Sequence, residues 1–227
     1  MHCCMCIFSL IFLLGNSSAE SPESWPEIKK MENGRYVFGG VTIDKKKRVI
    51  EFSAVSNQNN GLIEYGIVNE GGKIHESLFR TQVRPQIIHA SLLLLKEKPF
   101  KDYFEDLHNG RFHDNNYINH AFGVEIVWEN NGTRMEKNIR ELYSNQEKKD
   151  RYIKQGVFLF TGSRMIQKTF MAEHTGSILA VYIDQDALFN STEYDSNNDD
   201  VWIARKSEMP PLEIAVTCVF SLPKKLH

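Results

Sequence analysis

The sequence predicts a mainly β domain of the α+β class: an antiparallel sheet or barrel-like sandwich with one or two helices packed against it. Short runs rich in β-branched and aromatic residues recur along the chain, and clusters of Gly, Asn and Asp separate most of them. Only residues 85–97 have the length and apolar spacing of a long helix. The chain has 227 residues, enough to bury the core of one domain.

The N-terminus predicts a signal peptide at residues 1–19. Residues 3–14 form an apolar run, and Ser17 and Ala19 are small residues at the −3 and −1 positions of a cleavage site. No Lys or Arg precedes the run, so the α-amino group supplies the positive charge. The run is too short for a membrane anchor, and the polar residues after it disfavour a buried N-terminal helix. We therefore expect a secreted or periplasmic protein without a transmembrane anchor after cleavage.

Cleavage would leave one cysteine. Cys3, Cys4 and Cys6 would leave with the signal peptide, so no intrachain disulfide is expected. Cys218 lies in the apolar run 214–220, which predicts a buried, inert thiol.

The remaining chain is read as a polar lead-in at residues 20–33 and a single domain at residues 34–223. Two helices are expected, at 85–97 with Pro in its first turn and at 101–107. The charged segment 140–154 is consistent with a surface helix or a solvated loop. Strands are predicted at 36–43, 48–55, 62–68, 73–79, 124–128, 133–137, 157–161, 170–173, 178–183, 201–204 and 214–220.

A β-hairpin is predicted around Gly71 and Gly72, which favour a two-residue type I′ turn. In that register Glu64 and His75 share one face, and Glu76 lies on the other face among Ile and Leu side chains. A three-residue loop would instead place Glu64 and Glu76 on the same face, because a one-residue slip moves every side chain of a strand.

This hairpin supplies the candidate site residues. Glu64 and His75 are candidates for an acid/base pair, or for two ligands of a divalent metal completed by His89 or His113. Glu76 is the third candidate, since a buried carboxylate either pairs with a cation or takes up a proton. In the structural alternative, an arginine neutralises Glu76 and His75 is exposed.

A second metal hypothesis concerns an acidic loop. Asp195, Asn197 and Asp199 have the opening spacing of a calcium-binding loop. Asp200 stands where that loop needs Gly, and Lys206 where it needs a bidentate Glu. The pattern excludes an EF-hand and leaves a looser oxygen-ligated site or an Asp/Asn-rich surface loop.

Charge excludes one class of partner. The 27 Lys and Arg and 29 Asp and Glu residues give a formal net charge of −2, and the sequence contains no basic stripe with interleaved aromatics. We therefore expect no nucleic-acid partner.

Ser163 follows a predicted strand, but the sequence around it lacks the Gly-x-Ser-x-Gly elbow of a hydrolase nucleophile. The sequence therefore does not support Ser163 as a nucleophile.

Several motifs make the sequence similar to the YdjY-type domain of exported bacterial proteins. They are GLIEY (61–65), GKIHESL (72–78), HASLLL (89–94) and FTGS (160–163), with further likeness at 178–184 and 201–202. The family has no established activity, so the resemblance implies a domain identity and an exported location. Some relatives are associated with ferredoxin-type modules, but this chain lacks the cysteines that an iron–sulfur cluster requires, and none is expected.

Two functional classes follow. The favoured one is a non-enzymatic exported domain that binds a protein, a glycan or a cell-envelope component, because no complete catalytic set is recognised. The alternative is a metal-assisted hydrolase that uses Glu64, His75 and either Glu76 or His89. Convergence of these side chains in an open pocket would favour the enzyme, whereas salt bridges among them would favour the binding domain.

Overall fold

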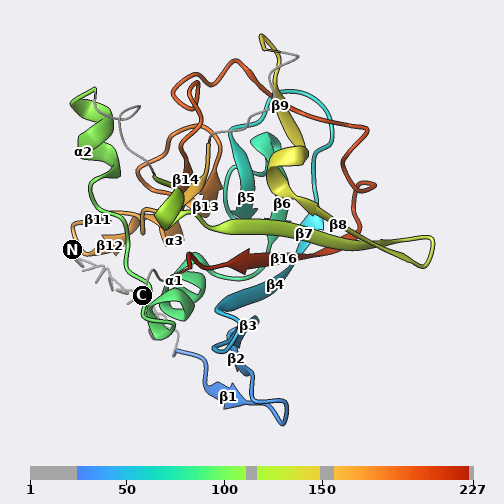
Figure 1. Ribbon diagram of the computed structural model, residues 1–227, viewed down its shortest axis with the longest axis vertical. Coiled ribbons are helices and arrows are strands. Elements are labelled where there is room, and N and C mark those ends of the chain that lie inside the picture. The colour runs from blue at the N-terminus through green and yellow to red at the C-terminus, as the bar shows by residue number, and fades with distance from the viewer. Residues whose placement is uncertain (1–24, 111–116, 149–155, 225–227) are drawn as a thin grey trace, which may run out of the picture.

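The computed structural model describes residues 25–110, 117–148 and 156–224, most of which surround one large β-sheet (Figure 1). The mainly β, α+β class predicted from the sequence is confirmed. The predicted signal peptide with its three cysteines, and His113, lie outside the described residues.

The strands are β1 (Ile28–Lys30), β2 (Tyr36–Phe38), β3 (Val41–Asp44), β4 (Val49–Ser56), β5 (Tyr65–Asn69), β6 (Ser77–Thr81), β7 (Gly123–Asn130), β8 (Thr133–Asn138), β9 (Tyr143–Asn145), β10 (Phe158–Phe160), β11 (Met165–Ile166), β12 (Thr169–Phe170), β13 (Ser177–Ala180), β14 (Phe189–Ser191), β15 (Trp202–Ala204) and β16 (Ala215–Ser221). The α-helices are α1 (Pro85–Leu94), α2 (Tyr103–His108) and α3 (Met171–Thr175), and short 3₁₀ turns are η1 (Ile74–Glu76), η2 (Tyr117–His120) and η3 (Ile139–Glu141).

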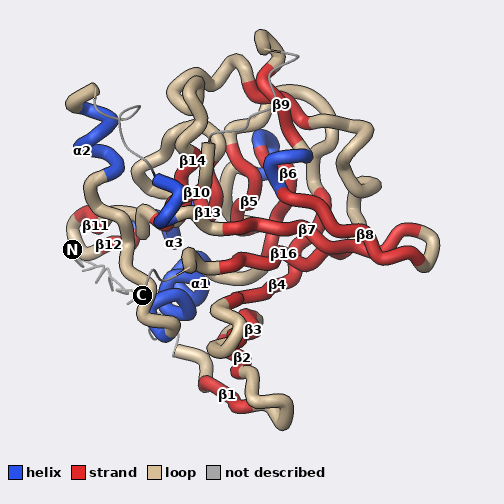
Figure 2. Tube along the Cα trace, viewed as in Figure 1, coloured by secondary structure: helices blue, strands red, loops and turns tan. Residues whose placement is uncertain are grey.

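Twelve of the described strands form a branched sheet (Figure 2). Its main path is β1-β2-β3-β4-β6-β5-β13-β14-β10, and β16 joins β4 to β7, which pairs with β8. Most pairs are antiparallel, as predicted, but β5 with β6 and β13 with β14 are parallel. The sheet is therefore mixed, and in the described part of the chain it stays open instead of closing like a barrel.

The long strands β4, β7 and β16 form the centre of the sheet. Their side chains alternate between buried and partly exposed, as expected for strands with one face on the core. Cys218 lies in β16 between Phe52 of β4 and Ile126 of β7. Its thiol is fully buried and makes no disulfide, so the prediction of a buried cysteine is confirmed. Burial raises the pKa of this thiol, which keeps it protonated and inert.

The predicted hairpin around Gly71 and Gly72 is wrong. The strands β5 and β6 run parallel, with Tyr65 beside Ser77, and residues 74–76 form the turn η1 instead of continuing a strand. A type I′ turn needs a left-handed backbone at both central residues. Neither Gly71 nor Gly72 has a positive φ.

Gly72 instead permits a close crossing of two backbone segments. A Cβ on Gly72 would lie 2.8 Å from the carbonyl oxygen of Thr175. A Cβ on Gly176 would lie 2.7 Å from the Cα of Gly72, and Gly176 has a φ of +73° as it ends α3. The short connection 70–76 can lead from the end of β5 back to the start of β6 only because Gly72 and Gly176, which touch at the crossing, have no side chains.

The helix α1 follows the prediction for 85–97 but ends three residues earlier, at Leu94. Pro85 occupies its first turn, as expected. Ile88 and Leu92 are buried in the core, while Leu93 and Leu94 are exposed. The shorter helix α2 confirms the prediction for 101–107 within two residues.

The strand predicted at 170–173 is wrong, since α3 begins at Met171. Its four residues, three of them apolar, are too few to show a period that separates a strand from a helical turn. The strand predicted at 36–43 is split in two by Gly39 and Gly40, both of which have positive φ.

None of the described helices is long and apolar enough to cross a membrane.

Gly66 provides a test of the packing around β5. A Cβ there would lie 2.6 Å from Cδ2 of Leu179 and 2.9 Å from Cδ1 of Ile139, both fully buried. We expect Gly66→Ala to reduce the free energy of unfolding by about 1–3 kcal/mol, because it overpacks the core. Gly71→Ala is the matched control, with its nearest contact at 3.5 Å, and should change stability by less than about 0.5 kcal/mol. Urea unfolding midpoints compare the two, and equal midpoints would contradict the packing account.

Candidate functional site

Two of the predicted site residues, Glu64 and Glu76, meet around Lys73. The Lys73 Nζ lies 3.0 Å from Glu64 Oε2 and 3.8 Å from Glu76 Oε2, and 5.3 Å from the centre of the Tyr65 ring. We call these four residues the Lys73 cluster. The parallel pairing of β5 and β6 produces it, because η1 brings the chain back beside the start of β5, where the Glu64 N–H donates to the Glu76 carbonyl.

The Lys73 cluster is an ion-pair network of one lysine and two carboxylates. Burial raises the pKa of the Glu64 carboxyl above its ordinary value, although the hydrogen bond from Lys73 acts in the opposite direction. For Lys73, partial burial acts to lower the pKa, but the hydrogen bond to Glu64 and the neighbouring charges raise it overall. The lysine ammonium therefore occupies the position between the carboxylates that a metal ion would need.

His75 does not join Glu64. Its side chain is 74% exposed and contacts Glu76, with Nε2 3.2 Å from Oε1. Glu76 is not buried among Ile and Leu as the hairpin register predicts, because it lies in η1 and not in a strand. One of its oxygens, Oε2, is nevertheless enclosed and accepts no hydrogen bond from a described residue.

The acidic loop is held by ion pairs and hydrogen bonds of its own. Asp195 pairs with Lys148 and accepts a hydrogen bond of 2.6 Å from Asn145 Nδ2. Asn197 and Asp199 contribute no ligand cluster with it: within the described ranges, no three His, Cys, Asp or Glu side chains are placed to hold a metal ion.

His89 lies in a different place, in a pocket of about 690 Å³ that none of the Lys73 cluster lines. We call it the His89 pocket. One wall is α1, which contributes Gln86, His89, Ala90 and Leu93. The others come from Trp25, from residues 99–104, and from the segment from Thr161 through β11 to Phe170, with Gln185 at one side. These elements lie along one side of the molecule (Figure 1).

His89 lines this pocket between two aromatic rings. Its ring lies 5.4 Å from that of Phe160 and 5.1 Å from that of Phe170. Burial lowers the pKa of His89, so the imidazole is neutral at pH 7. It makes no hydrogen bond or ion pair with any described residue. A half-buried imidazole without a protein partner is available to a ligand.

Gly162 lets the 160–163 segment pack directly against Pro99 beside His89. It has a φ of +82°, and a Cβ there would lie 2.4 Å from the Pro99 ring and 3.8 Å from His89 Nε2. The motifs HASLLL and FTGS, far apart in the sequence, thus meet at one point of the pocket.

The helix α3 fixes the pocket walls to each other. Its Glu173 accepts a hydrogen bond of 3.0 Å from the backbone N–H of Gln86 and one of 2.5 Å from Arg84 Nε, and so caps α1, which has no cap of its own. The Ala172 N–H donates to Ser163 Oγ over 2.9 Å. The α1 wall and the Ser163 wall are therefore joined through one short helix.

Hydrogen bonds also connect the pocket to the Lys73 cluster. Tyr65 Oη donates to Asp184 over 3.0 Å, and the Asp184 backbone N–H donates to Asn190 over 2.8 Å. Asn190 Nδ2 donates to Thr161 Oγ1 over 2.9 Å. Burial, followed by the charge of Asp184, raises the pKa of Tyr65, so its hydroxyl stays protonated as a donor.

Two cationic side chains line the His89 pocket, and only one of them is in an ion pair within the described part of the chain. Arg164 is paired, with Nε 2.5 Å from Asp186 Oδ1 and Nη1 3.1 Å from Gln185 Oε1. The Lys101 ammonium makes no ion pair or hydrogen bond with a described residue. Sequence reasoning named His89 but missed Lys101 and Phe170, because the pocket joins segments that share no sequence pattern.

The pocket contains no recognisable catalytic pair among the described residues. Ser163 makes no hydrogen bond to His89, and its Oγ is used by the α3 backbone. The arrangement is suited to holding a mostly apolar molecule that has one polar group.

Comparison with known proteins identifies a domain family. The family model described as the YdjY domain matches residues 41–221. No curated protein and no solved structure matches the chain. The matched range includes the Lys73 cluster and all of the His89 pocket except Trp25.

The raised pKa of Glu64 gives a pH prediction. Its pKa in the folded protein lies above the unfolded value of 4.5, so the stability that the group contributes is lost as pH rises through the folded pKa. Glu64→Gln removes this titration. The free energy of unfolding of this variant, relative to that of wild type, should therefore increase as the pH rises from the unfolded pKa through the folded pKa.

Unfolding in urea at several pH values measures this difference. Glu136→Gln is the control, because the Glu136 carboxylate is exposed and pairs with Arg134 in solvent. A Glu64→Gln variant that becomes relatively less stable with rising pH would show that the Lys73 ion pair outweighs desolvation.

Proposed function

The chain belongs to the YdjY domain family, and we propose that it is an exported, non-enzymatic binding domain that holds an anionic amphiphile, such as a long-chain fatty acid, in the His89 pocket. The observation that carries the proposal is a neutral imidazole with no protein partner, enclosed by aromatic and aliphatic side chains.

The size and lining of the pocket support an apolar ligand. Its volume of about 690 Å³ is typical of small-molecule sites. Its lining includes the apolar side chains of Ala90, Leu93, Phe104, Met165 and Phe170. An alkyl chain in such a pocket would be stabilised by about 0.8 kcal/mol for each buried methylene.

The polar groups support an acidic head group. Lys101 offers an unpaired positive charge, and His89 offers a ring nitrogen that can donate a hydrogen bond. A carboxylate that reaches both would satisfy two groups that the protein leaves unsatisfied. Arg164 contributes less, since Asp186 already neutralises it.

The Lys73 cluster supports the binding class over a metal-assisted hydrolase. Glu64 and Glu76 are engaged by Lys73, His75 points away from Glu64, and His89 lies in another pocket. The residues of the hydrolase hypothesis therefore do not converge on one reacting atom.

Export is part of the proposal. It is supported by the apolar run at residues 3–14 and by the small residues Ser17 and Ala19 after it. A secreted or periplasmic location would expose the domain to envelope lipids and their fatty acids.

Titration with palmitate tests the pocket, with Trp25 as a built-in reporter. Trp25 is exposed at the pocket, whereas Trp128 and Trp202 are buried, so palmitate should change the emission of Trp25 alone. Ala90→Phe fills the pocket and should weaken palmitate binding at least about tenfold, or about 1.4 kcal/mol. Leu94→Phe is the matched control on the same helix, because Leu94 is exposed and does not line the pocket.

The head-group contact is tested separately with His89→Leu. This variant should bind palmitate about tenfold more weakly, because the palmitate carboxylate loses the hydrogen bond that the His89 imidazole donates. Its affinity for methyl palmitate, which has no carboxylate, should be unchanged. Equal palmitate affinities of the Ala90→Phe and Leu94→Phe variants, or no binding by the wild-type protein, would contradict the proposed function.

A further inference from the structure

Exposed apolar side chains gather at the mouth of the His89 pocket. Trp25, Leu93 and Met165 all line the pocket, yet they are 59%, 46% and 61% exposed. Leu94 and Ile166, next to two of them in the chain, are also exposed. Large apolar side chains that surround one opening mark an interaction surface more strongly than the same residues scattered singly.

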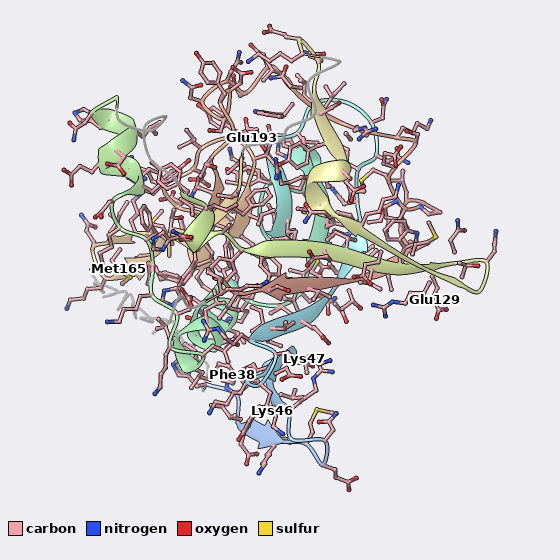
Figure 3. All side chains as sticks on the ribbon, in the orientation of Figure 1. Phe38, Lys46, Lys47, Glu129, Met165 and Glu193 are labelled. Carbon is pink, nitrogen blue, oxygen red and sulfur yellow. The ribbon has the colours of Figure 1, made fainter. Side chains whose placement is uncertain are left out.

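A tight hairpin presents two of these side chains. In β11 and β12, Met165 pairs with Phe170 and Ile166 with Thr169, which leaves a two-residue turn. The turn residues Gln167 and Lys168 have φ values of +46° and +70°, as in a type I′ turn. Figure 3 shows Met165 at the edge of the molecule, far from Lys46 and Lys47.

Unpaired lysines accompany the apolar side chains. Lys96, Lys98, Lys101 and Lys168 make no ion pair with any described residue. Of the carboxylates in the same segments, Glu97 pairs with Arg48 over 2.7 Å and Asp106 is buried, so Asp102 and Glu105 are the exposed carboxylates set against the four lysines. Lys101 lines the pocket and Lys168 lies in the turn of the β11–β12 hairpin, so the surface around the pocket mouth is both apolar and positively charged.

We infer that this surface docks the pocket mouth onto an anionic lipid bilayer. Trp25 would lie at the interface, as tryptophans in membrane proteins do, with Ile166 and Met165 among the acyl chains. The lysines would lie level with the lipid phosphates, where each basic residue adds to binding. A protein partner fits less well, because the centre of a protein interface is depleted of lysine.

This inference rests on the proposed function at one point, namely that the ligand of the pocket is an amphiphile. A pocket that opens between membrane-inserted side chains would receive such a molecule from the bilayer without its passing through water. The docking surface itself depends only on the exposed apolar side chains and the lysines.

Co-sedimentation with vesicles tests the inference. The full protein should bind vesicles of equal parts phosphatidylglycerol and phosphatidylcholine at least about tenfold more tightly than vesicles of phosphatidylcholine alone. Raising the salt concentration from about 0.1 M to about 1 M should remove most of this difference.

The double variant I166D/K168E locates the surface. Neither residue lines the pocket, so the variant should lose at least about tenfold in vesicle affinity and still bind palmitate in solution. The control K46E/K47E changes the net charge by more, on the exposed turn after β3, and should keep vesicle binding. A wild-type protein that ignores anionic vesicles, or equal losses in the two variants, would overturn the inference.

The two proposals fail in different ways. Palmitate binding without vesicle binding would overturn docking and leave the proposed function standing. Vesicle binding that I166D/K168E removes, in a protein that does not bind palmitate, would support docking and overturn the proposed ligand.

Discussion

The close crossing of Gly72 over Gly176 is the constraint on which both candidate sites depend. Gly72 lies in the short connection that lets β5 and β6 run parallel, and Gly176 joins α3 to β13. Most parallel neighbours need a longer crossover, usually a helix. Here two glycines let the backbones touch, so the connection returns directly and brings Lys73 and Glu76 beside Glu64.

The same crossing positions the wall of the His89 pocket. It fixes the C-terminal end of α3, whose other end carries Phe170 against the His89 ring. Glu173 and Ala172 then tie α3 to α1 and to the Ser163 segment. In the Lys73 cluster the lysine ammonium engages both carboxylates, whereas the pocket retains His89 and Lys101 without a hydrogen bond or ion pair to a described residue. Unmatched polar groups in an apolar enclosure are what a ligand can satisfy.

The sequence predicted the elements whose pattern is local. Residues 48–55, 124–128 and 214–220 alternate or are continuously apolar over a full strand, and they became β4, β7 and β16. Residues 85–97 hold Pro in the first turn and apolar residues at helical spacing, and they became α1. Where the pattern was short or had two physical causes, prediction was wrong. A Gly-Gly pair serves a tight turn and a close crossing equally well, so the direction of β6 and the partners of Glu76 could not be read from it.

For the candidate site too, residues marked by a local pattern could be predicted from the sequence, and residues brought together only by tertiary packing could not. His89 could be named from the sequence because a histidine in an apolar helix is conspicuous, but its companions could not. Trp25 lies in the predicted polar lead-in, Lys101 and Phe170 are unremarkable in their own segments, and only tertiary packing brings them together. Glu64 and His75 looked paired only within a hairpin register that the chain does not adopt.

The most direct test of the account is to map where palmitate touches the protein by intermolecular nuclear Overhauser effects. We expect contacts from the alkyl-chain protons of palmitate to the rings of His89 and Phe170. Contacts to Tyr65 and Lys73 instead, or to exposed side chains outside the pocket only, would contradict it.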